Sequence, residues 1–101
     1  MWILRSIDDT KGLDDPQFTF RLGAGAIKTI GRAARADFIV DAALVSRLHC
    51  RLTASEESVE AVDLSSTNGT YLNDTRVDRA QLTSGDRLRV GRVEFTLERQ
   101  D

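Results

Sequence analysis

The chain has 101 residues, a formal net charge of -2 at pH 7 and a sequence pI near 5.4, with 41% hydrophobic and 30% charged residues. This length and composition are typical of one soluble globular domain with a single core. The longest apolar stretch, residues 22–27, is too short to span a membrane, and one cysteine excludes an internal disulfide framework. The acidic balance disfavours a dedicated nucleic-acid binder, because phosphate neutralisation needs clustered lysine and arginine.

Short segments in which apolar and polar residues alternate follow one another along the chain, separated by glycine and polar clusters. A period of two predicts strands with one apolar face, and no window carries an apolar stripe of helical period. The predicted strands, in chain order, are residues 2–7, 18–22, 27–30, 38–40, 48–52, 59–64, 70–72, 87–90 and 93–98. Residues 8–17, which include the sole proline, Pro16, are predicted to form a long surface loop.

Three polar segments interrupt the strand pattern: residues 31–35, 45–49 and 65–70. All three fall between predicted strands, and loops at one end of a sandwich commonly carry binding residues. Residues 31–51 contain four arginines and only two aspartates, so the positive charge is local in a chain that is acidic as a whole. Arginines beside hydroxyls and an amide suit one small dianion such as a phosphate group.

Taken together, these segments closely resemble the signature of forkhead-associated (FHA) domains. The matching motifs, in chain order, are Gly31-Arg32, Ser46-Arg47-x-His49, Ser66-Thr67-Asn68-Gly69-Thr70-Tyr71-Leu72-Asn73 and Gly85-Asp86-x-Leu88. The resemblance covers roughly residues 18–97. It implies that residues 1–101 form a single FHA domain. It implies an all-β fold, an FHA-like β-sandwich of about eleven strands whose apical loops bind phosphothreonine in partner proteins.

By matching positions, the resemblance also implies roles for single residues. Four would contact the phosphate: Arg32, Ser46, Arg47 and Thr67. Three would shape the loops: Gly31, His49 and Gly69. Asn68 would hydrogen-bond the peptide backbone beside the phosphothreonine. Leu44, two residues before Ser46, would form a specificity rim with Arg35, and its apolar side chain predicts an apolar residue three positions after the phosphothreonine.

The implied function is a non-catalytic module that recognises a protein phosphorylated by a Ser/Thr kinase. No cofactor, metal, nucleic acid or membrane insertion is expected. The chain is expected to be monomeric or part of a longer protein. Its expected location is the cytoplasm, or the nucleus in a eukaryote.

Other interpretations of the same residues remain open. A phosphorylation-independent domain could use a sandwich face to dimerise, although the sequence shows no clear outward apolar stripe. Ser46 and His49 could belong to a hydrolase, although no G-x-S-x-G elbow surrounds the serine. Asn68-Gly69 is also a strong hairpin-turn signal, and such a turn could itself present the Thr67 hydroxyl.

Several further side chains have structural interpretations. His49 is expected to hydrogen-bond the neighbouring loop, and Cys50 to be a small core residue because it shares parity with Leu48 and Leu52. Two aspartates are predicted to anchor turns: Asp63 and Asp86. Four arginines of the last hairpin are predicted to form only its solvent-exposed face: Arg87, Arg89, Arg92 and Arg99.

Overall fold

The structure, a computed structural model, describes residues 1–7 and 17–100. Residues 8–16 of the predicted surface loop lie outside the described residues. Within the described part of the chain there are eleven strands: β1 (Trp2–Ser6), β2 (Thr19–Leu22), β3 (Ile27–Gly31), β4 (Phe38–Ile39), β5 (Cys50–Ala54), β6 (Val59–Asp63), β7 (Thr70–Leu72), β8 (Thr75–Val77), β9 (Arg79–Leu82), β10 (Arg87–Val90) and β11 (Val93–Arg99). No helix long and apolar enough to cross a membrane occurs among these residues.

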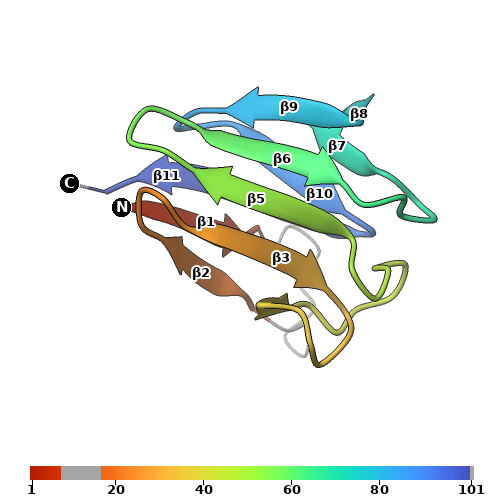
Figure 1. Cartoon of the computed structure of the whole chain (residues 1–101). Helices are drawn as coiled ribbons and strands as arrows, with labels where there is room; N and C mark the ends of the chain where they lie inside the picture. The colour runs from red at the N-terminus through yellow and green to blue at the C-terminus, as the bar shows by residue number, and fades with distance from the viewer. Residues whose placement is uncertain (8–16, 101) are drawn as a thin grey trace.

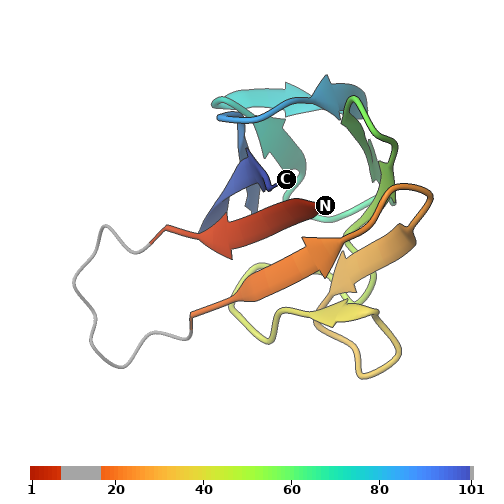
Figure 2. The same cartoon turned by 90° about the vertical axis from the view of Figure 1, so that its left-hand side faces the viewer.

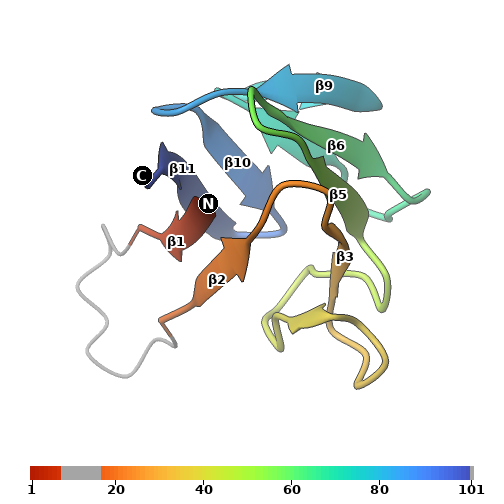
Figure 3. The ribbon, with the colours of Figure 1, turned by 60° about the vertical axis from the view of Figure 1, so that its left-hand side comes forward.

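The strands form two sheets. The six-stranded sheet has the order β2-β1-β11-β10-β7-β8, and the five-stranded sheet has the order β4-β3-β5-β6-β9 (Figure 1). Paired strands run antiparallel, except that β3 and β4 run parallel. Figure 3 shows the two sheets facing each other across the interior. The predicted all-β sandwich is therefore confirmed.

The core lies between the sheets and is built from the alternating apolar residues of the strands. In β5, Cys50, Leu52 and Ala54 are all buried, whereas the residues between them are only half-buried. Aromatic rings join the sheets, with Phe20 and Phe38 stacked at 4.4 Å between ring centroids. Burying one such side chain stabilises a fold by about 1.5–3 kcal/mol. The many buried side chains of the core therefore make the sandwich a stable framework for its loops.

Apart from shifts of one residue at strand ends, the structure differs from the predicted strands in two places. Strands β8 and β9 have no counterpart in the sequence-based prediction, because both are short and mostly polar, and Leu82 is their only buried residue. The strand predicted over residues 48–52 begins only at Cys50. Leu48 is half-buried in the preceding loop, so its parity with the core residues of β5 was misleading.

The three polar segments emerge at one end of the sandwich. Figure 1 shows the β3–β4, β4–β5 and β6–β7 connections together on the right, beside the turn that joins β10 to β11. The two chain ends lie at the opposite end, where Trp2 pairs with Arg99 across β1 and β11 (Figure 2). The scaffold thus gathers segments that are about 15 to 35 residues apart in the chain.

Candidate functional site

Gly31, the last residue of β3, brings the first two loops into direct contact. A β-carbon at this position would lie 2.0 Å from the backbone oxygen of Arg47. Only glycine permits this approach. The Arg32 N–H donates to the Ser46 carbonyl at 2.9 Å, and the Ala33 N–H donates to the Arg47 carbonyl at 3.1 Å. Two backbone hydrogen bonds therefore hold the first loop against the second.

His49 is completely buried and joins the second loop to the third. Its Nδ1 accepts the backbone N–H of Ser46 at 3.0 Å, so Nδ1 carries no proton. Its Nε2 then carries the ring proton and donates to the carbonyl oxygen of Gly69 at 2.8 Å. The carbonyl of His49 also accepts the Leu64 N–H at 2.9 Å. The ring therefore holds two loops in register, as expected of a structural histidine.

Asp63, at the end of β6, organises the third loop from within. Its carboxylate accepts the hydroxyls of Ser66 at 2.6 Å and Thr70 at 2.7 Å, and also the Ser66 N–H at 3.1 Å. The Ser66 hydroxyl in turn accepts the N–H of Gly69 at 2.9 Å. Gly69 has a φ of 89°, in the left-handed region that favours glycine. Asp63 is thus a loop anchor, as the sequence predicts.

The same contacts control the ionisation of this carboxyl group. Burial acts to raise the pKa of Asp63, but the hydrogen bonds from Ser66 and Thr70 and the nearby His49 together hold that pKa below its ordinary value. A carboxyl whose pKa is lowered by folding stabilises the fold above its unfolded pKa, and this contribution is lost as the pH falls through the folded pKa.

We therefore expect the melting temperature to fall as the pH drops below about 4, the ordinary pKa of an aspartate. Asp63→Asn should flatten this acid limb and lower the melting temperature at pH 7, since an amide replaces one acceptor oxygen with a donor. Thermal melts from pH 7 to pH 2 measure both effects. An unchanged acid limb in Asp63→Asn would show that other groups govern acid unfolding.

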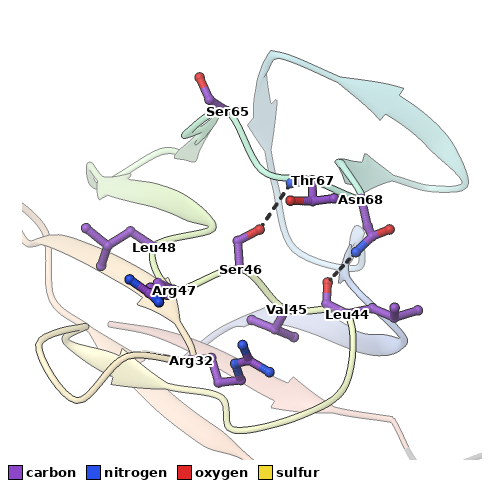
Figure 4. Close-up of a pocket in the computed structure, with 9 residues that line it drawn as sticks. All are labelled: Arg32, Leu44, Val45, Ser46, Arg47, Leu48, Ser65, Thr67 and Asn68. Carbon is purple, nitrogen blue, oxygen red and sulfur yellow. Dashed lines mark hydrogen bonds between the residues drawn. The ribbon is translucent and has the colours of Figure 1, made fainter.

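Two further hydrogen bonds tie the second and third loops together at the surface. The hydroxyl of Ser46 accepts the N–H of Thr67 at 3.1 Å, and the Asn68 side-chain Nδ2 donates to the Leu44 carbonyl at 3.1 Å (Figure 4). Leu44 has a φ of 69°, which turns its carbonyl toward the third loop. The Ser46 hydroxyl still has its own proton to donate, and the Thr67 hydroxyl makes no hydrogen bond to another described residue.

The loops enclose an open pocket of about 470 Å³. Its lining residues are Arg32, Leu44, Val45, Ser46, Arg47, Leu48, Ser65, Thr67 and Asn68. Figure 4 shows Ser46 near the centre, with Arg32 and Arg47 on one side and Thr67 and Asn68 on the other. All four residues predicted to contact phosphate, the residue predicted to bind peptide backbone and Leu44 of the rim thus lie around one pocket.

Some residues fall outside this correspondence. Arg35 is exposed on the first loop but does not line the pocket. Conversely, the FHA motifs assign no role to three further residues that line the pocket: Val45, Leu48 and Ser65. Ser65 has a φ of 57°, a backbone conformation that sequence periodicity does not reveal.

The pocket carries uncompensated positive charge. The guanidinium groups of Arg32 and Arg47 form no ion pair with any residue that the structure describes, and no carboxylate lines the pocket. Ion pairs instead engage arginines elsewhere: Arg5 with Glu98, Arg79 with Glu60, and Arg87 with both Asp74 and Glu94. Two free guanidinium groups beside two hydroxyls and an amide are suited to a dianionic ligand.

The geometry does not support a Ser46–His49 nucleophile. The backbone N–H of Ser46 occupies His49 Nδ1, while the Ser46 hydroxyl accepts from Thr67. A hydrolase would need the hydroxyl to face the ring nitrogen. Cys50 is fully buried, and burial, with the nearby charge of Asp63, raises the pKa of its thiol to about 12. The thiol is therefore protonated and unreactive at neutral pH.

Comparison with known proteins places the chain in one family. The family model described as the FHA domain matches residues 28–91. An ABC transporter ATP-binding/permease protein, Rv1747 of Mycobacterium tuberculosis, is 37% identical over 79 residues, covering 78% of this chain and 9% of that protein. The glycogen accumulation regulator GarA of Mycobacterium tuberculosis is 37% identical over 67 residues, covering 66% of this chain and 41% of that protein. The chain thus spans less than half the length of these curated relatives.

The three-dimensional comparison agrees. A solved structure from a study of phosphothreonine-dependent FHA domain interactions superposes with a TM-score of 0.82 at 32% sequence identity. The superposition covers 99% of this chain and 97% of that chain. At this similarity the matched region includes the sandwich and the loops that form the pocket.

Proposed function

The chain belongs to the FHA domain family, and on that premise we propose that its apical pocket binds a phosphothreonine residue of a partner protein. The observation that carries the proposal is that two unpaired arginines, the hydroxyls of Ser46 and Thr67 and the Asn68 amide converge from three loops on one pocket without a carboxylate. A phosphomonoester brings a charge of about -1.5 to -2 at neutral pH and three acceptor oxygens, which match this set of donors.

The polar residues at the centre of the pocket have roles that their geometry favours. Arg32 and Arg47 neutralise the dianion, and Ser46 donates the hydroxyl proton that its bond from Thr67 leaves available. The Thr67 hydroxyl supplies a further donor. Asn68 uses its Nδ2 to hold Leu44, so its Oδ1 remains to accept a backbone N–H of the bound peptide.

The module acts by binding and not by catalysis. It recognises a protein after a Ser/Thr kinase has modified it, because the phosphate supplies the charge that the pocket lacks. Leu44 is 44% exposed at the rim of the pocket and offers an apolar surface. It selects an apolar residue three positions after the phosphothreonine, whereas Arg35 lies farther along the first loop.

Removing a single hydroxyl should weaken binding by a moderate amount. We expect Ser46→Ala and Thr67→Ala each to cost about 1–3 kcal/mol in phosphopeptide affinity, because each deletes one hydrogen bond to a charged group. Titration calorimetry measures the loss, and Thr19→Ala, an exposed threonine on β2, is the matched control. Full affinity in Thr67→Ala would show that the Thr67 hydroxyl does not contact the phosphate.

The proposed site can be located without knowledge of the partner. Addition of a capped phosphothreonine amide to the labelled protein should shift the amide resonances of residues 31–35, 44–49 and 65–69 in two-dimensional NMR spectra. The capped threonine amide should leave them unchanged. Shifts elsewhere in the sandwich, or none with the phosphorylated compound, would contradict the proposal.

A further inference from the structure

The outer face of the six-stranded sheet carries a second group of arginines. Tyr71 on β7 pairs in register with Arg76 on β8 and with Arg89 on β10. Thr70, the preceding residue of β7, is completely buried, so Tyr71 lies on the opposite, outward face of the sheet. Arg76, Tyr71 and Arg89 therefore form one row across three strands, which we call the basic row.

The two arginines of the basic row differ in how firmly they are held. The guanidinium of Arg89 lies 4.0 Å from the centroid of the Tyr71 ring, a cation–π contact, and it donates to the Gly91 carbonyl at 3.4 Å. The side chain of Arg76 folds over Gly69, where a β-carbon would lie 2.7 Å from its Nε. Arg89 is half-buried and already fixed by these contacts, so less of its side-chain entropy is lost when an anion binds, whereas Arg76 is exposed.

The basic row adjoins the rim of the pocket. Gly69, beneath Arg76, directly follows the pocket residue Asn68. On the neighbouring strand, the turn at Gly91 packs against the rim, since a β-carbon there would lie 3.0 Å from the carbonyl oxygen of Leu44. A peptide that leaves the pocket over the rim formed by Asn68 and Leu44 would therefore lie near the basic row.

The carboxylates of this face do not neutralise the basic row. Glu94 pairs in register with Arg89, but its carboxylate lies 3.6 Å from Arg87. Asp74 also contacts Arg87, at 3.3 Å. One arginine thus engages both acids. Within residues 1–7 and 17–100, Arg76 and Arg89 form no ion pair.

We propose that the basic row binds anionic side chains, carboxylate or phosphate, that flank the phosphothreonine of the partner, an inference that rests on the proposed function. Its contacts are exposed, so each contributes modestly and depends on salt. The row therefore determines which phosphorylated segments are preferred, while the pocket determines whether phosphothreonine is recognised.

The test compares phosphothreonine peptides that differ only in their flanks. The first peptide has neutral flanks. Two further peptides carry three aspartates, one on the N-terminal and the other on the C-terminal side of the phosphothreonine. The last two carry one phosphoserine instead, on the N-terminal or the C-terminal side. At about 0.05 M salt, we expect an anionic flank on one side to tighten binding about fivefold, and the gain to vanish near 0.5 M salt, where exposed charges are screened. A gain from phosphoserine alone identifies phosphate as the preferred anion.

The double variant Arg76→Gln/Arg89→Gln should lose the gain and keep its affinity for the neutral-flank phosphopeptide. Arg5→Gln/Arg79→Gln removes the same charge from arginines that are already ion-paired, and it should retain the gain. Equal affinity of the parent for all flanks, or a gain that survives in the double variant, would overturn the inference. If the unmutated protein binds the neutral-flank phosphopeptide but gains no affinity from anionic flanks, only the inference about the basic row is contradicted. If the unmutated protein binds no phosphopeptide at all, the proposed function is contradicted.

Discussion

Arg32→Ala is expected to remove most phosphopeptide binding while leaving the fold intact. The side chain is exposed at the pocket, and no described residue forms an ion pair with it, so its truncation leaves no partner unpaired in the free protein. In the complex, loss of one member of a hydrogen-bonded charge pair costs about 2–5 kcal/mol. Titration calorimetry against a phosphothreonine peptide measures the affinity, and circular dichroism checks the fold.

The matched control is Arg51→Ala, which removes the same charge from a half-buried arginine on β5, outside the pocket. This variant should bind like the parent apart from a small electrostatic loss. If Arg32→Ala binds as tightly as Arg51→Ala, the first loop does not hold the phosphate.

Gly31→Ala is expected to damage both stability and binding, although position 31 presents no side chain to the ligand. The added methyl group would meet backbone atoms of Arg47 at 2.0 and 2.7 Å, and a backbone cannot rotate away as a side chain can. Overpacking of this kind typically costs about 1–3 kcal/mol, occasionally more. Separation of the loops would also misplace Arg32 relative to Ser46, so affinity should fall even in the molecules that remain folded.

Gly23→Ala is the control for this substitution, because a β-carbon at Gly23 would meet nothing within 4 Å. It should leave the melting temperature and phosphopeptide affinity close to those of the parent. A Gly31→Ala protein that melts and binds like Gly23→Ala would show that the first two loops can separate at no cost.

Most strands of the sandwich are predictable from the sequence because each has one solvent-exposed and one buried face. Residues 93–98, for example, alternate with a period of two, and Phe95 and Leu97 are fully buried. Strands β8 and β9 are too short and too polar for an alternating pattern to be visible, since Leu82 is their only buried residue. Leu48 was assigned to a strand because its parity matched β5, although the chain turns into the pocket before Cys50.

The membership of the pocket was predictable only through motifs. Composition and periodicity indicate three polar loops and local positive charge, but not that these loops meet. The loops meet through long-range contacts. Gly31 lies against the backbone of Arg47 because it has no β-carbon, and the His49 ring hydrogen-bonds the carbonyl of Gly69. For the same reason Arg89 resembled an ordinary solvent-facing arginine until the strand register placed it beside Tyr71.

The most direct test of the central claim compares one peptide in three forms. A phosphothreonine peptide selected from an oriented library is titrated into the protein by calorimetry, beside the same peptide with threonine or with glutamate at that position. The phosphothreonine form should bind with one-to-one stoichiometry. The other two should show no measurable binding, because a carboxylate has one charge and two coplanar oxygens where phosphate has nearly two charges and three acceptor oxygens. Comparable affinity for the threonine or glutamate form would contradict phosphate recognition.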